Sequence, residues 1–186
     1  MKKRVLLTLC GFAALAAAIV CLPVSREINT TTAATEYRLD DPAYAVEHTV
    51  TIQGRDARNL LGYGHFEGTF AVSGFESGQP GWMIYTVFSN KKSLRTTYSS
   101  NPSGEPCTRD LFCLWANRDW SSFAGLIMEV TDHADSASGN FSPDSGRFLV
   151  SGPADRDAAV ARAAKLFQKD PYWHSLFQPP DRKSVV

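Results

Sequence analysis

The stretch HFEGTFAVSGFE, residues 65–76, alternates apolar and polar side chains with a period of two residues. Phe66, Phe70 and Val72 fall on one face of this stretch. The opposite face carries polar side chains such as Glu67. This alternation is typical of a β-strand that buries one face and exposes the other. The stretch therefore predicts a sheet with one side packed on a core.

Similar strand-like runs flank this stretch on both sides. WMIYTVFS, residues 82–89, is apolar on both faces, which is typical of a central strand that is covered on each side. No helical segment separates the runs, so we expect an antiparallel sheet. The other runs are HTVTIQG (48–54), SLRTTYSS (93–100), LFCLWAN (111–117), FAGLIMEVTD (123–132) and RFLVSG (147–152).

One helix is predicted at the end of the chain, from PADRDAAVARAAKLFQKD, residues 153–170. Val160, Ala163, Ala164 and Phe167 form an apolar stripe at helical spacing, which must be buried against the strands. The resulting fold class is α+β, an antiparallel sheet of about six or seven strands with one C-terminal helix packed on it. An all-β sandwich or barrel with a C-terminal helix is the alternative.

The N-terminus predicts a membrane anchor. Lys2, Lys3 and Arg4 precede an uncharged run, Val5–Val24, whose 20 residues would span about 30 Å as a helix. The flanking cations place the N-terminus in the cytoplasm and the C-terminal domain outside the cell membrane. A cleaved signal sequence and a lipid-modified Cys21 remain alternatives.

The chain then divides into four parts. Residues 1–24 form the cytoplasmic tip and the transmembrane anchor, or a signal sequence. Residues 25–46, rich in Thr and Ala, are expected to be a flexible linker. Residues 47–178 form the extracytoplasmic β-rich domain, and residues 179–186 form a disordered tail.

Charge excludes one class of partner. The chain has 19 basic and 19 acidic residues, and the part after the three N-terminal cations is weakly acidic. Nucleic-acid binding requires a concentrated Lys/Arg face, so we expect no nucleic-acid partner.

Cys107 and Cys113 are the cysteines outside the anchor, and in an oxidising compartment such a pair favours a disulfide. Two buried thiols, or a metal or redox pair, are the alternatives.

Asp132, His133 and Asp135 form the candidate metal site, because carboxylates beside an imidazole can bind a divalent cation or polarise a water. The simpler interpretation is a polar strand end that enters a solvated loop. Trp120 falls at a predicted turn and would be a ligand-binding residue if exposed there, although packing in the core is favoured. The sequence contains no nucleophile, zinc-protease or phosphate-loop motif, and no cofactor is expected.

Three segments carry a resemblance, TVTIQG (49–54), FEGTFAVSGF (66–75) and FLVSGPADRDAAVARAAKLF (148–167). The chain resembles uncharacterised small N-terminally anchored extracytoplasmic proteins of Gram-positive bacteria. The resemblance implies no activity, and Val20 before Cys21 departs from the lipoprotein members.

The predicted function is non-catalytic binding, sensing or an accessory role at the cell surface. A protein or cell-wall partner is expected, and the membrane is contacted through the N-terminal helix. The alternative is a small surface hydrolase or metal-dependent enzyme that uses Asp132, His133 and Asp135.

Overall fold

The computed structural model of the chain describes residues 2–75, 82–89, 92–93, 95–99, 108–133, 136–152, 155–168, 170 and 174–177. Its long helices are α1 (Lys2–Cys21) and α2 (Arg156–Phe167). The strands, in chain order, are β1 (Val24–Arg38), β2 (Ala45–Arg58), β3 (Gly64–Val72), β4 (Met83–Ser89), β5 (Lys92–Ser93), β6 (Arg95–Ser99), β7 (Thr108–Ala116), β8 (Phe123–Ile127), β9 (Glu129–His133), β10 (Ser136–Asn140) and β11 (Arg147–Ser151).

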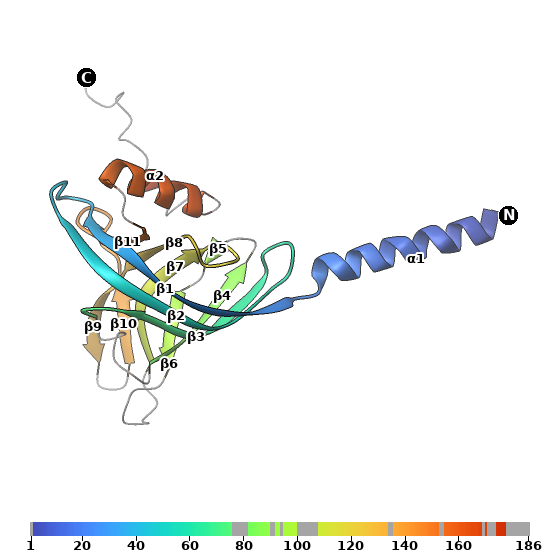
Figure 1. Cartoon of the computed structure of the whole chain (residues 1–186), viewed down its shortest axis with the longest axis horizontal. Coiled ribbons are helices and arrows are strands. Elements are labelled where there is room, and N and C mark those ends of the chain that lie inside the picture. Colours follow the sequence, from blue (N-terminus) through green and yellow to red (C-terminus); the bar gives the residue numbers. More distant parts are fainter. Residues whose placement is uncertain are drawn as a thin grey trace, which may run out of the picture.

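Eight of the described strands close into a barrel in which each strand is antiparallel to the next (Figure 1). The ring runs β1, β2, β3, β4, β6, β7, β8 and β11, and pairing of β11 with β1 completes it. β5 adds to β4, and the β9–β10 hairpin joins β7 through one parallel pair. The sheet therefore matches the barrel alternative rather than the α+β arrangement.

Large apolar side chains fill the barrel interior. Phe66, Phe70 and Val72 of β3 have no exposed surface, which confirms the strand predicted from this part of the sequence. β4 differs from its prediction, because Met83 is 40% exposed and Tyr85 is 45% exposed. The outer face of β4 is thus open, and this strand has one buried face rather than two.

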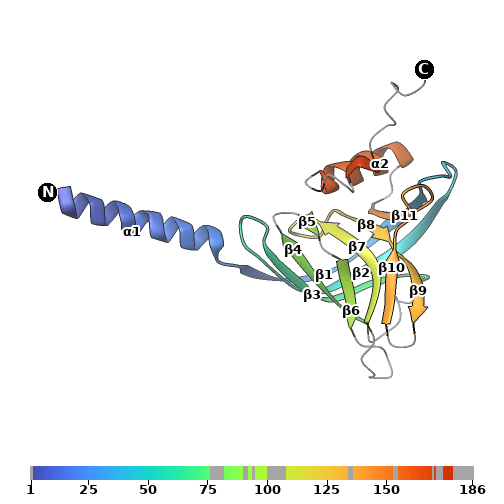
Figure 2. The ribbon, with the colours of Figure 1, turned by 180° about the vertical axis from the view of Figure 1, so that it is seen from behind.

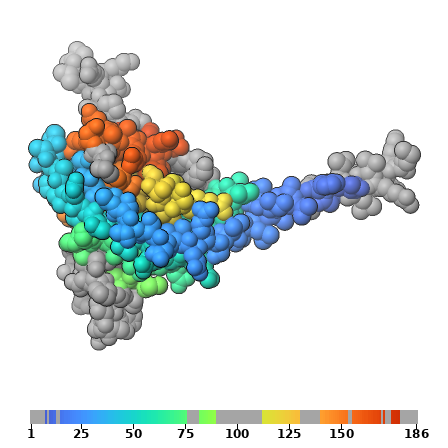
Figure 3. All heavy atoms as spheres, viewed as in Figure 1, coloured from blue at the N-terminus to red at the C-terminus, as the bar shows by residue number. Residues whose placement is uncertain are grey.

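Helix α2 packs on the outer face of β7, β8 and β11. Figure 2 shows the helix beside these strands, and Figure 3 shows its atoms, in orange, packed on the rest of the domain. Asp155 caps the helix N-terminus, because its carboxylate accepts a hydrogen bond from the Ala158 N–H at 2.8 Å. The predicted C-terminal helix is confirmed, and its buried residues are Ala159, Ala163 and Phe167. Val160 and Ala164 of the predicted stripe are only partly buried against the same cluster. β8 and β11 are consequently covered on both faces, by the barrel core on one side and by α2 on the other.

Most of residues 25–46, predicted as a flexible linker, belong to the sheet, and only residues 39–44 form a loop between β1 and β2. β1 pairs with β2 along nearly its whole length and with β11 near its end. Ile28 and Ala34 are buried in the barrel interior, so this Thr-rich segment has a core-facing side. The domain predicted at 47–178 therefore begins earlier, with β1. The predicted tail, 179–186, lies outside the described residues.

Helix α1 extends away from the sheet (Figure 1). It spans 20 residues, but its first three are cationic, and it ends at Cys21 rather than at Val24, where β1 begins. The uncharged run counted in the sequence is thus divided between a helix and a strand. Within the residues that the structure describes, no helix is both long and apolar enough to cross a membrane. The predicted spanning helix, the fold class that included it and the single-pass location derived from it are therefore not supported.

Gly68 of β3 lies opposite Gly54 of β2, and the two strands approach each other closely at this point. A Cβ added to Gly68 would lie 2.6 Å from the Cα of Gly54, a main-chain atom that cannot rotate away. Replacing Gly68 with alanine should therefore lower the free energy of unfolding by about 1–3 kcal/mol, measured by urea denaturation. The control is Thr69→Ala in the same strand, expected to cost less than about 1 kcal/mol. Equal effects of the two variants would contradict the prediction.

Candidate functional site

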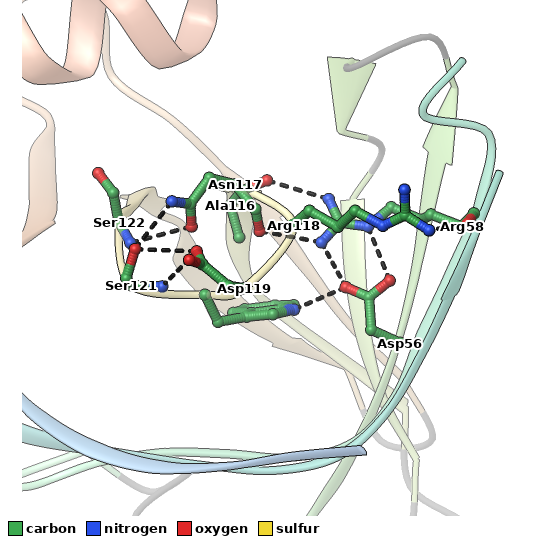
Figure 4. A network of polar contacts seen from close by, with 9 residues as sticks. Asp56, Arg58, Ala116, Asn117, Arg118, Asp119, Ser121 and Ser122 are labelled. Carbon is green, nitrogen blue, oxygen red and sulfur yellow. Dashed lines mark hydrogen bonds and ion pairs between the residues drawn. The ribbon is translucent and has the colours of Figure 1, made fainter. Parts of the chain in front are cut away.

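One end of the barrel is closed by a buried polar network of Asp56, Arg58 and Trp120. Arg58 points toward Asp56 (Figure 4), with Arg58 Nε donating to Asp56 Oδ1 at 2.8 Å and Arg58 Nη2 donating to Asp56 Oδ2. Trp120 Nε1 donates to the same Oδ2 at 2.8 Å. The three residues are at most 7% exposed. One carboxylate thus satisfies a buried cation and a buried indole N–H.

Arg58 also holds the turn between β7 and β8. Its Nη1 donates to the carbonyl of Ala116 at 3.0 Å and its Nη2 donates to the carbonyl of Asn117 at 2.9 Å.

In the same turn, hydrogen bonds from the Ser121 hydroxyl and N–H hold the pKa of Asp119 below its ordinary value. Folding therefore favours the ionised carboxylate of Asp119. The stability that these hydrogen bonds add is fully present above the ordinary carboxyl pKa. It is lost as the pH falls through the lowered value.

The turn places Trp120 inside the barrel. Trp120 has a φ of 58°, a left-handed conformation that is unusual for a large side chain. Its ring centroid lies 4.5 Å from that of Phe66 and 6.2 Å from that of Phe70. An eight-stranded barrel is either filled by side chains or holds one small ligand, and here aromatic side chains occupy the interior. Trp120 has no exposed surface, so it is a core residue and not an exposed ligand contact.

A second polar cluster lies near the start of β2. The network of Asp56 lies near the other end of the same strand. The buried carboxylate of Glu36 accepts hydrogen bonds from the Tyr44 hydroxyl at 2.8 Å and from Arg147 Nη1 at 3.2 Å. His48 Nε2 lies 3.1 Å from the other carboxylate oxygen. The hydrogen bond to Glu36 raises the pKa of Tyr44. This cluster joins β1, β2, β11 and the β1–β2 loop, so it stabilises the second end of the barrel.

A cavity of 710 Å³ lies between the C-terminal half of α2 and the end of the barrel that Asp56 and Trp120 close. We call it the α2 cavity. It is lined by Arg58, Asn59, Leu60, Gly62, Phe88, Trp115, Ala116, Asn117, Arg118, Ser122, Ala161, Arg162, Lys165, Leu166 and Gln168.

The lining of the α2 cavity combines two kinds of side chain. Its large apolar side chains are Leu60, Phe88, Trp115 and Leu166. Its cationic side chains are Arg58, Arg118, Arg162 and Lys165. Among the described residues, no Asp or Glu lines it. A site with apolar walls and a few positioned polar groups is typical of small-molecule binding.

None of the lining residues was predicted as a site from the sequence. They come from three segments, residues 58–62, 115–122 and 161–168, together with one residue of β4. Lys165 fits equally well as a cation near a helix C-terminus. The sequence feature that could have indicated this site is the spacing of Arg162 and Lys165, which places both beside the buried stripe of α2.

The predicted metal site is only partly covered by the structure. Asp132 and His133 belong to β9, where they pair with Ala137 and Ser136 of β10. Asp135 lies outside the described residues. Within the described parts of the chain, no group of three His, Cys, Asp or Glu side chains is arranged to hold a metal ion. The metal site stays a prediction.

The predicted disulfide is not supported. Cys113 lies in β7, 3% exposed, in the apolar cluster between the sheet and α2. Cys107 lies outside the described residues, and no disulfide is present in the part of the chain that the structure covers. The burial of Cys113 follows from the alternation of β7, whose neighbouring residues Phe112 and Leu114 face the barrel interior.

No protein-family model, curated protein or solved structure matches the chain. The resemblance to anchored extracytoplasmic proteins stays a prediction.

Proposed function

We propose that the protein is a non-catalytic binding protein that holds a small molecule in the α2 cavity. The observation that carries this proposal is the cavity itself. Its volume of 710 Å³ lies within the range of roughly 300–1,000 Å³ that is usual for small-molecule sites. The proposal keeps the binding role expected from the sequence. The hydrolase or metal-dependent enzyme and the protein or cell-wall partner stay predictions.

The walls of the α2 cavity are held in place by contacts that do not involve a ligand. On the barrel side, Arg58 is fixed by Asp56 and its guanidinium lies 4.2 Å from the ring centroid of Phe88. On the helix side, Phe167 packs against Trp115 with ring centroids 4.2 Å apart. A site whose walls are ordered beforehand loses less entropy when a ligand binds. This arrangement therefore supports binding in a preformed site.

Filling the α2 cavity should weaken ligand binding strongly. Ala161 is exposed on α2 and lines the cavity, so Ala161→Trp adds an indole to the cavity without removing a core side chain. We expect at least a tenfold loss of affinity for Nile red, a neutral apolar dye, measured by fluorescence titration of the full chain.

Ala158→Trp is the matched control, because Ala158 is also exposed on α2 but does not line the cavity. The measured quantity is the difference in Nile red affinity between Ala161→Trp and Ala158→Trp. This comparison is needed because Nile red also adsorbs to exposed apolar side chains such as Phe12 of α1. Circular dichroism would verify that both variants fold. Equal Nile red affinity of the folded Ala161→Trp and Ala158→Trp variants would refute the proposed function.

A further inference from the structure

We propose that the ligand of the α2 cavity is an amphipathic organic anion, whose charged group is held by Arg118, Arg162 and Lys165. This inference rests on the proposed function and adds the chemical class of the ligand.

The net charge of the lining is the first argument. Four cationic side chains line the cavity, and no Asp or Glu does so among the described residues. The charge of Arg58 is compensated, because its guanidinium is paired with the buried carboxylate of Asp56. Three positive charges are therefore left without an opposite charge in the lining.

The hydrogen bonds of these cations are the second argument. Arg118 Nη2 donates to the carbonyl of Arg58 at 3.2 Å, and Arg162 Nη1 donates to the carbonyl of Ser151. These main-chain contacts orient each guanidinium but leave its charge in place. No described carboxylate forms an ion pair with Arg118, Arg162 or Lys165, whereas half-buried Arg147 is paired with Glu36.

Electrostatics then favours an anion in the cavity. Half-buried Arg118 and Arg162 lie beside one partly enclosed, largely apolar space, where like charges repel one another more strongly than in bulk water. Exposed Lys165 contributes less, because solvent screens its charge. Such a space also concentrates the potential and attracts an opposite charge. An anionic group in the α2 cavity would relieve this repulsion and accept charge-assisted hydrogen bonds.

The remaining walls determine the rest of the ligand. Exposed Leu60 and half-buried Leu166, with the small accessible edges of Phe88 and Trp115, offer apolar surface that a bare inorganic anion would leave in contact with water. An apolar body joined to one anionic group satisfies both parts of the lining. The depression over β1–β3 differs, because Glu27 and Glu67 accompany Arg55 there.

The test compares two ligands with the same chain, decanoate and decan-1-ol, by isothermal titration calorimetry of the full-length protein. We expect decanoate to bind at least tenfold more tightly than decan-1-ol, because hydrogen bonds to charged groups are worth more than those to neutral groups. The Arg118→Gln/Lys165→Gln double variant should lose most of this preference. Raising the salt concentration should also reduce it.

Arg55→Gln is the matched control, because Arg55 lies on the outer face of β2 and outside the α2 cavity. It should retain the preference for decanoate. Equal affinity for the two ligands in the wild-type protein, or an unchanged preference in the double variant, would overturn the anionic class. The binding function would survive either result if Ala161→Trp still removed the binding of both ligands. Unchanged binding of both ligands to Ala161→Trp would refute the function itself.

Discussion

Replacing Asp56 with alanine should lower the free energy of unfolding by about 3–5 kcal/mol, because the change leaves the buried Arg58 guanidinium without its counter-charge. The Trp120 indole N–H would lose its acceptor at the same time. A loss of this size is a large fraction of the total stability of a domain, which is about 5–15 kcal/mol. Urea denaturation followed by circular dichroism would measure it.

Two further variants show whether the loss comes from burial of the charge. Asp40→Ala removes a similar contact to Arg38, but that pair is about 40% exposed and should be worth less than about 1 kcal/mol. The double variant Asp56→Leu/Arg58→Met removes both charges, so it should be more stable than Asp56→Ala alone. A cost below 1 kcal/mol for Asp56→Ala would show that the network contributes little.

Replacing Trp120 with alanine should lower the free energy of unfolding by about 3–5 kcal/mol, because it removes the largest fully buried side chain of the described residues and leaves a cavity among Phe66, Phe70 and Phe88. Trp120→Phe keeps an aromatic ring but removes the hydrogen bond to Asp56. Trp120→Phe should therefore lower the free energy of unfolding by less than Trp120→Ala, by about 1–3 kcal/mol relative to the wild type.

Thermal and urea unfolding of both Trp120 variants would test this order. Near-ultraviolet circular dichroism adds an independent readout, because Trp120 is surrounded by aromatic rings. A Trp120→Ala variant as stable as the wild type would mean that the interior of the barrel closes up around the missing side chain.

Local patterns predicted most of the strands and the C-terminal helix, because side-chain alternation depends only on neighbouring residues. β1 was missed, because its Thr- and Ala-rich sequence was interpreted as a flexible linker. The buried face of β3 followed from the spacing of Phe66, Phe70 and Val72. The end of α1 was missed because apolar composition alone does not show where a helix stops. Pro23 and the β-branched Thr30–Thr32 were the signals that a strand follows.

Local sequence patterns could not predict that the barrel closes, nor that the α2 cavity exists. Closure depends on pairing between β1 and β11, which lie near opposite ends of the chain. The cavity depends on how α2 is placed over the end of the barrel, and its cations look like ordinary surface residues in the sequence. For Trp120, the turn position left exposure open as an alternative to the favoured core packing. The structure shows the ring fully buried, on a residue with a left-handed backbone.

The pairing of β1 with β11 also affects the order of events during synthesis. In every other neighbouring pair, the second strand is the next strand of the ring to be synthesised after the first. Each strand can therefore pair with the one made before it as the chain emerges. Until β11 has been made, the nascent chain presents unpaired edges on β1 and β8, and exposed strand edges promote aggregation. A chain interrupted before Arg147 is therefore expected to depend on chaperones, whereas release of the complete chain removes both edges in a single step.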